Sequence, residues 1–266
     1  MKIIFTGDNH VWYHDQHKGV TNMMKLICSE KPDVVCNIGD FGEILMSKKI
    51  TLVEELFSCQ PTLYVFGNHD IYNEQYLTPP EAMDRALTKM KCGKPLQTSW
   101  KDTKTSVEMG EFLFLGTMGF PDFKHPKLMM PLPYYDDKCP TIDGTYMNLQ
   151  NGWIQYTRTM VAAFEKKLAL VDNSKCSTVI ILTHYPIFET QYRISFVDEV
   201  SAYFYCHSIG LLVKEAAERN PGKAFYCMAG HGHEYCQGEW VEDGNVFSHG
   251  FVTRYNEQKY VTLVIP

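Results

Sequence analysis

The sequence predicts an α/β fold with a mixed sheet, and two observations lead to this prediction. In the first part of the chain, short apolar runs alternate with amphipathic stretches, which is the pattern of parallel β-α-β units. Near the end, Asp243-Gly244 separates two short apolar runs and favours a hairpin, which adds antiparallel pairing. A mixed α/β sandwich accommodates both kinds of strand pairing.

The individual elements follow from the local pattern. Pro80 suits the first turn of a helix, and Asn220-Pro221-Gly222 ends another. Runs rich in β-branched or aromatic residues give the strands, and apolar residues three or four apart give the helices. The strands are expected at Ile3–Thr6, Asp33–Ile38, Leu63–Phe66, Phe112–Gly116, Thr178–Thr183, Ala224–Ala229, Glu239–Val241, Val246–Ser248 and Tyr260–Ile265. The helices are expected at Val20–Ser29, Ile50–Ser58, Pro80–Met90, Gln155–Leu170 and Leu211–Arg219.

Length and composition indicate one globular domain over residues 1–266. The net charge of −6 argues against an extended surface for nucleic acids or anionic membranes. No apolar stretch approaches transmembrane length, and the first apolar run is too short for a signal peptide. The nine cysteines are scattered without C-x-x-C spacing, which favours buried free thiols. We therefore expect a cytoplasmic protein without membrane attachment.

The segment from Met118 to Trp153 is rich in proline and aromatic residues. A connection of this length is uncommon inside a compact domain unless it has a function. We expect either a loop or lid, inserted at residues 118–153, that selects the substrate, or a surface loop whose aromatic side chains cover an edge of the core.

Polar clusters follow five of the expected strands, each at the carboxyl end of its strand. Ligand sites in parallel sheets form at these ends, so the clusters can converge on one crevice. Any one cluster alone would more often be a tight turn or a group of solvated polar side chains, so the site is inferred from their joint occurrence. The clusters are Gly7-Asp8-Asn9-His10, Gly39-Asp40, Gly67-Asn68-His69-Asp70, Thr183-His184 and Gly230-His231-Gly232-His233.

These residue types suit two neighbouring divalent ions. Carboxylates supply hard oxygen ligands, and imidazoles supply nitrogen ligands that suit manganese, iron or zinc. One carboxylate can bridge two ions, and glycine allows the backbone to turn sharply beside them. Two ions about 3.5–4 Å apart can polarise a phosphoryl group and hold a hydroxide for in-line attack. The clusters therefore indicate a dinuclear centre that cleaves phosphate esters.

The motifs, taken in order, resemble those of the calcineurin-like metallophosphoesterase superfamily. They lie between residues 7 and 233, so the resemblance covers most of the chain. It implies a four-layer αββα sandwich of two mixed sheets with a dinuclear metal site at its rim. The matching motifs are Asp8-x-His10, Gly39-Asp40, Gly67-Asn68-His69-Asp70, His184 and Gly230-His231-x-His233.

The resemblance also implies a role for each matching position. His69 would lie beside the leaving group and either protonate it or stabilise the developing charge. Asp70 would orient His69 and help protonate it. Two divalent ions are expected, with manganese preferred and iron or zinc as alternatives. One ion would be bound by Asp8, His10 and His233 and the other by Asn68, His184 and His231, with Asp40 as the bridge.

Departures from the protein Ser/Thr phosphatases narrow the branch. The first motif lacks a glycine after His10, the second continues as Phe41-Gly42-Glu43, and the third ends in Asp70 rather than Glu. The chain therefore resembles the phosphodiesterase and diverse-phosphatase branches more closely. The expected reaction is hydrolysis of a small-molecule phosphate ester, a diester being slightly favoured, by attack of a metal-bridging hydroxide.

Two alternatives to this reaction stay open. One is a phosphomonoesterase acting on a nucleotide, a sugar phosphate or a phosphoprotein, and the other is a non-catalytic scaffold of the same fold. Arg193 and Arg254 either bind a substrate phosphate or form surface ion pairs. The sequence does not indicate an oligomeric state.

Overall fold

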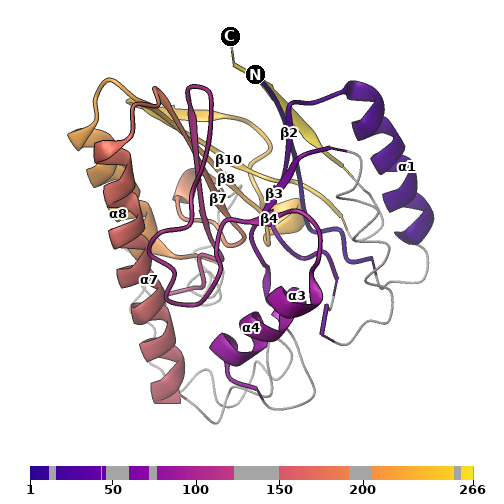
Figure 1. Cartoon of the computed structure of the whole chain (residues 1–266), viewed down its shortest axis with the longest axis horizontal. Coiled ribbons are helices and arrows are strands. Elements are labelled where there is room, and N and C mark those ends of the chain that lie inside the picture. Colours follow the sequence, from indigo (N-terminus) through magenta and orange to yellow (C-terminus); the bar gives the residue numbers. More distant parts are fainter. Residues whose placement is uncertain are drawn as a thin grey trace.

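Two β-sheets pack face to face, with helices on both outer sides, in the computed structural model of the chain (Figure 1). The structure describes residues 1–11, 16–42, 44–45, 60–71, 77–122, 150–191, 205–254 and 259–265. In Figure 1, α1 lies on one side of the sheets, and α7 and α8 lie together on the other. The predicted fold class, an αββα sandwich of two mixed sheets, is confirmed.

The first sheet is built mainly from the N-terminal part of the chain. Its strand order is β11-β1-β2-β3-β4, with β1, β2, β3 and β4 parallel and β11 antiparallel to β1. The ammonium group of Met1 donates a hydrogen bond to the carbonyl of Ile265, so these two positions lie side by side. The strands are β1 (Lys2–Thr6), β2 (Val34–Asn37), β3 (Thr62–Tyr64), β4 (Lys94–Pro95) and β11 (Val261–Val264).

The second sheet has the order β5-β6-β7-β8-β10-β9. Its four central strands are parallel, and an antiparallel strand closes each edge. Gly244 takes a φ of +65° in the predicted hairpin between β9 and β10. The strands are β5 (Val107–Met109), β6 (Phe112–Thr117), β7 (Thr178–Thr183), β8 (Ala224–Ala229), β9 (Val241–Asp243) and β10 (Val246–Gly250).

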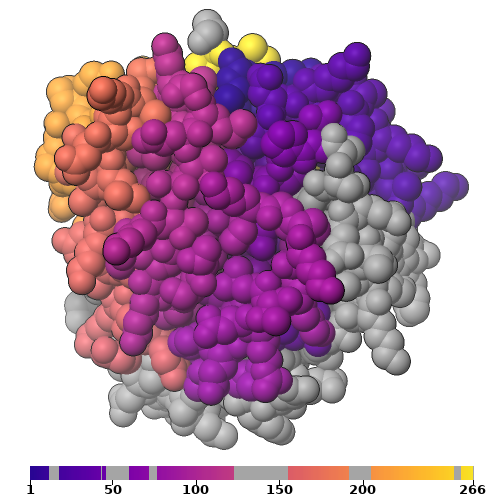
Figure 2. Space-filling view, in the orientation of Figure 1, coloured from indigo at the N-terminus to yellow at the C-terminus, as the bar shows by residue number. Residues whose placement is uncertain are grey.

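The helices cover the outer faces of the sheets. The amide of Thr78 donates to the carboxylate of Glu81 at 2.9 Å, which caps the start of α4. On the face shown in Figure 2, residues around 80–120 cover the middle of the molecule. The α-helices are α1 (Gln16–Glu30), α3 (Asn68–Ile71), α4 (Pro79–Lys89), α7 (Gln150–Asn173) and α8 (His207–Arg219), and the 3-10 turns include η2 (Glu189–Gln191) and η4 (His233–Tyr235).

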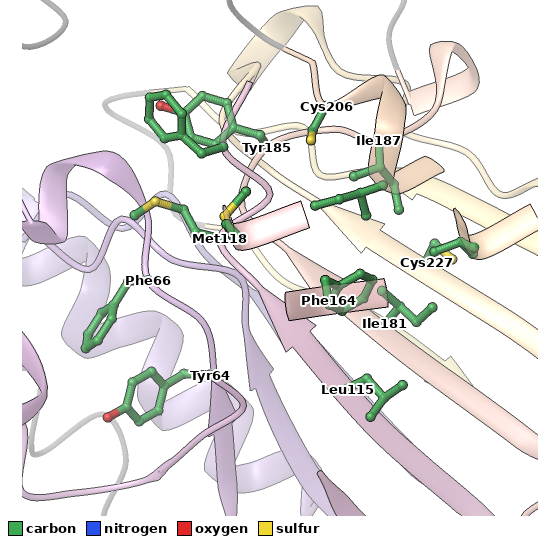
Figure 3. Packing of buried hydrophobic residues seen from close by; sticks show 14 of the residues in the cluster. Tyr64, Phe66, Leu115, Met118, Phe164, Ile181, Tyr185, Ile187, Cys206 and Cys227 are labelled. Atoms are coloured by element: carbon green, nitrogen blue, oxygen red, sulfur yellow. The ribbon is translucent and has the colours of Figure 1, made fainter. Parts of the chain in front are cut away.

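Alternate side chains of the strands enter two hydrophobic clusters. Phe5 and Ile38 of the first sheet meet Phe114 and Leu182 of the second in the layer between the sheets. The other cluster lies under the helices and continues across the strand ends, where Figure 3 shows Met118 between Phe66 and Tyr185. The core therefore packs the two sheets against each other at the end of the sandwich where the polar clusters follow the strands.

A buried lysine also joins the elements of the second helical layer. The ammonium group of Lys167 donates to the carbonyls of Leu96 and Gly116 at 2.7 and 2.9 Å. Its third donor reaches Oδ2 of Asp102 at 3.1 Å, and only 1% and 5% of these two side chains are exposed. Through these contacts Lys167 connects α7 to β6 and to the segment that follows β4.

Some elements and one disulfide bond were not predicted from the sequence. It did not indicate β4, β5 or the short helix α3, and the helix expected at Ile50–Ser58 lies outside the described residues. Cys28 is disulfide-bonded, which corrects the expectation of free thiols at that position. The thiols of Cys36, Cys92, Cys176, Cys206, Cys227 and Cys236 are free as expected. No helix in the described part of the chain is long and apolar enough to cross a membrane.

Candidate metal centre

The polar clusters that follow β1, β2, β3, β7 and β8 meet at one end of the sandwich. Asp40 lies at their centre and is 1% exposed. Its Oδ2 is 3.3 Å from Nε2 of His184 and 3.7 Å from Nε2 of His10. Its Oδ1 accepts a 3.0 Å hydrogen bond from the amide of His69. Asp40 is therefore the carboxylate that faces histidines from both expected ligand sets.

The expected ligands form two adjacent groups around this carboxylate. In the first group, Nε2 of His10 lies 3.3 Å from Nε2 of His233, and the two rings stack. In the second, Nε2 of His184 lies 3.0 Å from Oδ1 of Asn68, and the ring centroid of His231 is 5.1 Å from that of His184. Each group combines side chains from both sheets.

The donor atoms are close enough for each group to hold an ion. The ligand atoms of Asp8, His10 and His233 all lie within 4.8 Å of one another, and so do those of Asp40, His184 and His231. The same limit also places His69 with His10 and Asp40. His69 thus lies beside the expected ligands, at a position from which it can act on a group bound between them.

Hydrogen bonds with the backbone orient two of the ligands. Nδ1 of His184 lies 3.0 Å from the carbonyl oxygen of Ile38 and donates its proton there, so Nε2 faces Asp40. Oδ1 of Asp8 accepts a hydrogen bond from the amide of His231 at 3.2 Å. These contacts leave the remaining donor atoms directed toward the interior of the cluster.

Five of the expected ligands have a left-handed backbone conformation. Their φ angles are +49° for Asp8, +42° for His10, +53° for Asp40, +64° for His231 and +47° for His233. Residues other than glycine rarely adopt this conformation, and such backbone strain gathers at functional sites. The turns after three strands are therefore held in strained forms that direct ligands into one crevice.

The Asp70 carboxylate links the two loops around Asp40. Its Oδ2 accepts hydrogen bonds from the amides of Asp40 and Gly67, both at 2.8 Å, and its Oδ1 accepts one from the amide of Gly42 at 3.2 Å. The resemblance predicts that this carboxylate orients His69 and helps to protonate it, and that role stays a prediction. In the structure its hydrogen bonds go to backbone amides, so it fixes the loop after β2 against the loop after β3.

The electrostatics of the site reflect its burial. Burial raises the pKa of the Asp8 carboxyl, and burial together with the nearby charge of Asp40 raises the pKa of Asp70 to about 8. Burial opposes ionisation of Asp40 too, but the imidazoles of His184 and His69 hold its pKa well below the usual range. Several acidic groups thus share a buried site, which a bound cation would stabilise.

The residues present fit a pair of metal ions. Oδ2 of Asp8 is buried and has no hydrogen-bond partner among the described residues. A Cβ atom added to Gly67 would lie 2.0 Å from Oδ1 of Asp40, and one added to Gly230 would lie 2.7 Å from Oδ2 of Asp8. The backbone therefore approaches both carboxylates as closely as glycine allows, and the donor set of carboxylate, amide and imidazole suits manganese, iron or zinc.

The motifs and their convergence agree with a match to a protein family. The model of the calcineurin-like phosphoesterases, Metallophos, matches residues 1–235. The chain belongs to the calcineurin-like phosphoesterase family. This phosphoesterase is a metal-dependent hydrolase of phosphoric esters. Among curated proteins, none matches its sequence.

Several solved structures are similar to this phosphoesterase at low sequence identity. A dimetal phosphatase from Danio rerio is 13% identical, with a TM-score of 0.60, over 98% of this chain and 91% of that one. GAP50, the anchor in the inner membrane complex of Plasmodium, is 13% identical over 94% and 70%, with a TM-score of 0.48. A 5'-nucleotidase from Candida albicans is 14% identical over 96% and 45%, with a TM-score of 0.44.

Sequence reasoning missed the groups that support the ligands. The carbonyl of Ile38 and the amide of Gly42 are backbone atoms, which no residue-type pattern identifies.

Arg254 forms an exposed ion pair with Glu234 at 3.4 Å, in keeping with the surface-pair alternative. Arg193 and most of the segment 118–153, from residue 123 to 149, lie outside the described residues.

Proposed function

We propose that this phosphoesterase cleaves a small phosphodiester at a centre of two divalent ions. The observation that supports this most directly is the arrangement of two ligand groups around the single carboxylate of Asp40. Manganese is the expected metal, with iron and zinc as alternatives. One ion would be held by Asp8, His10 and His233, the other by Asn68, His184 and His231, and both by Asp40.

The bound ions would supply Lewis-acid activation of the phosphoryl group and of the attacking water. The side chains around them hold the reacting groups. His69 is the second residue of α3, and the hydrogen bond from its amide to Oδ1 of Asp40 keeps it beside the ligands. From this place its imidazole donates a proton to the departing oxygen, which a poor leaving group such as an alkoxide requires.

The preference for a diester rests on the charge of the described site. Among the described residues, the neighbouring charges that act most strongly on Asp8, Asp40 and His184 belong to aspartates and histidines. A monoester carries more negative charge than a diester and gains more from an additional cationic side chain. A diester carries a single negative charge and therefore fits this site better than a monoester does.

Two model substrates test the preference. After removal of metal with a chelator and reloading with Mn²⁺, we expect a higher kcat/KM with bis-p-nitrophenyl phosphate than with p-nitrophenyl phosphate. A clear preference for the monoester would refute the diester assignment and favour the phosphomonoesterase alternative. Absence of activity on both esters, together with fewer than two Mn²⁺ per chain by elemental analysis, would refute the dinuclear centre and favour a scaffold.

Two substitutions separate chemistry from metal binding. His69→Ala should retain Mn²⁺ but lose about 10²–10⁴-fold in kcat with a diester that releases an alkoxide, because general acid catalysis contributes about that much. Asp40→Ala should lose metal as well as activity, because it removes the shared ligand. Normal turnover of the alkoxide ester by His69→Ala would contradict the proposed acid.

A further inference from the structure

Tyr185 is a fully buried aromatic residue directly after the expected ligand His184. The amides of His184 and Tyr185 both donate to the carbonyl of Met118, each at 3.1 Å. A Cβ atom added to Gly119 would lie 3.2 Å from the carbonyl oxygen of Tyr185, so the two chain segments are in close contact. Only 1% of Tyr185 is exposed. Its backbone therefore has little freedom to move.

The ring of Tyr185 lies among three other rings. The centroid of Phe120 is 5.1 Å away, and that of His184 is 5.2 Å away in an edge-on arrangement. The centroid of His231 is nearer, at 4.0 Å, with 41° between the ring planes. Figure 3 shows Tyr185 at the end of the core cluster, beyond Met118 and away from Leu115 and Ile181. The shortest of these ring contacts thus reaches an expected metal ligand.

His231 and His184 are oriented in different ways. The ring of His184 is held by its hydrogen bond to the carbonyl of Ile38. His231 follows β8 with a φ of +64°, and its amide is bonded to Asp8, which fixes its backbone. Packing of neighbouring side chains limits how far this ring can turn about its side-chain torsions. Tyr185 covers one side of this ring, and the edge of His184 limits it at 5.1 Å.

We propose that Tyr185 is a positioning residue whose ring holds the imidazole of His231 in the orientation that binds metal. The metal role of His231 itself rests on the function proposed above. Loss of the Tyr185 ring removes this packing from the His231 imidazole. The affinity for the ion held by Asn68, His184 and His231 then falls. The affinity for the ion held by Asp8, His10 and His233 stays unchanged. The aromatic ring supplies the contact, so phenylalanine can replace tyrosine.

Metal titration of three variants tests the proposal. Mn²⁺ bound per chain is measured by equilibrium dialysis with elemental analysis. Groups that orient metal ligands typically change affinity by about 10–100-fold. Tyr185→Leu should weaken one of the two ions by about this factor and leave the other unchanged, whereas Tyr185→Phe should bind both like the wild type. Phe114→Leu, the matched control, truncates a fully buried aromatic of the inter-sheet core and should also keep both ions.

The selectivity of the loss distinguishes positioning from a general loss of structure. Equal weakening of both ions in Tyr185→Leu, or an equal loss in Phe114→Leu, would overturn the proposal. Wild-type affinity for both ions in Tyr185→Leu would overturn it as well.

A second measurement does not depend on metal. In the metal-free protein with ¹³C-labelled histidine, the His231 ring signals are shifted by the adjacent Tyr185 ring. They should move in Tyr185→Leu and remain in place in Tyr185→Phe, and unchanged signals in Tyr185→Leu would refute the contact. If the wild type binds fewer than two ions, the dinuclear centre fails while these spectra still decide the role of Tyr185.

Discussion

Replacement of Lys167 by methionine should strongly destabilise the protein. The substitution keeps an unbranched side chain of similar length but removes the ammonium group from a site where 1% of it is exposed. The carbonyls of Leu96 and Gly116 then lose a donor at 2.7 and 2.9 Å. The Asp102 carboxylate loses its counter-ion and remains buried.

The size of the effect follows from these contacts. Removal of one partner of a buried ion pair costs about 3–5 kcal/mol. Asp102 retains hydrogen bonds from the amides of Thr98, Lys104 and Thr105, each at 3.0 Å, which reduces the cost of its unpaired charge. The lower half of the range, about 3–4 kcal/mol, is therefore expected for Lys167→Met.

Urea unfolding followed by circular dichroism measures this loss. With a slope of about 3 kcal/mol per M for a chain of this size, the midpoint should fall by about 1 M. Lys166→Met is the matched control, because Lys166 is exposed on the same helix and should change the free energy of unfolding by less than about 0.5 kcal/mol. A midpoint for Lys167→Met as close to the wild type as that of Lys166→Met would refute the reasoning.

Three further predictions concern packing, pH and the site. Gly210→Ala places a Cβ atom 2.0 Å from the carbonyl oxygen of Ile187 and should lower stability by about 1–3 kcal/mol, whereas Gly222→Ala, which has open space, should be nearly neutral in thermal unfolding. Burial lowers the pKa of His249 from 6.5 to about 4, so protonation favours the unfolded chain. The free energy of unfolding should therefore fall by up to about 3 kcal/mol as the pH decreases from 6.5 to 4. His249→Phe should flatten this part of the plot of urea midpoint against pH. Asp70→Asn should weaken Mn²⁺ binding by about 10–100-fold through the loop of Asp40, and an unchanged affinity would contradict its positioning role.

The convergence of the expected ligands could be predicted from the sequence because these residues combine two local signals. Asp8 and Asp40 each follow a buried apolar run that forms a parallel strand, and the carboxyl ends of such strands share one edge. By the same rule, His184 and His231 follow parallel strands of the second sheet and lie at the same end of the sandwich. The pattern of residue types was therefore sufficient to place donors far apart in the sequence near one another.

Other features depend on three-dimensional packing and leave little local signal. β4 is a two-residue strand, Lys94–Pro95, and neither residue has a strong preference for strands. Asn68, His69 and Asp70 follow a glycine and resemble a turn, yet they begin α3. The amides that bind Asp70 belong to two separate loops, so its partners could be identified only once those loops were placed together.

Each proposed ion would connect the two sheets. One takes Asp8 and His10 from the N-terminal sheet and His233 from the other, and the second joins Asn68 to His184 and His231. Metal would then act as a cross-link between distant parts of the chain, in addition to its part in hydrolysis. Ions that bind only the assembled sandwich raise the free energy of unfolding with their concentration. Separation of the two sheets would in turn release both ions together.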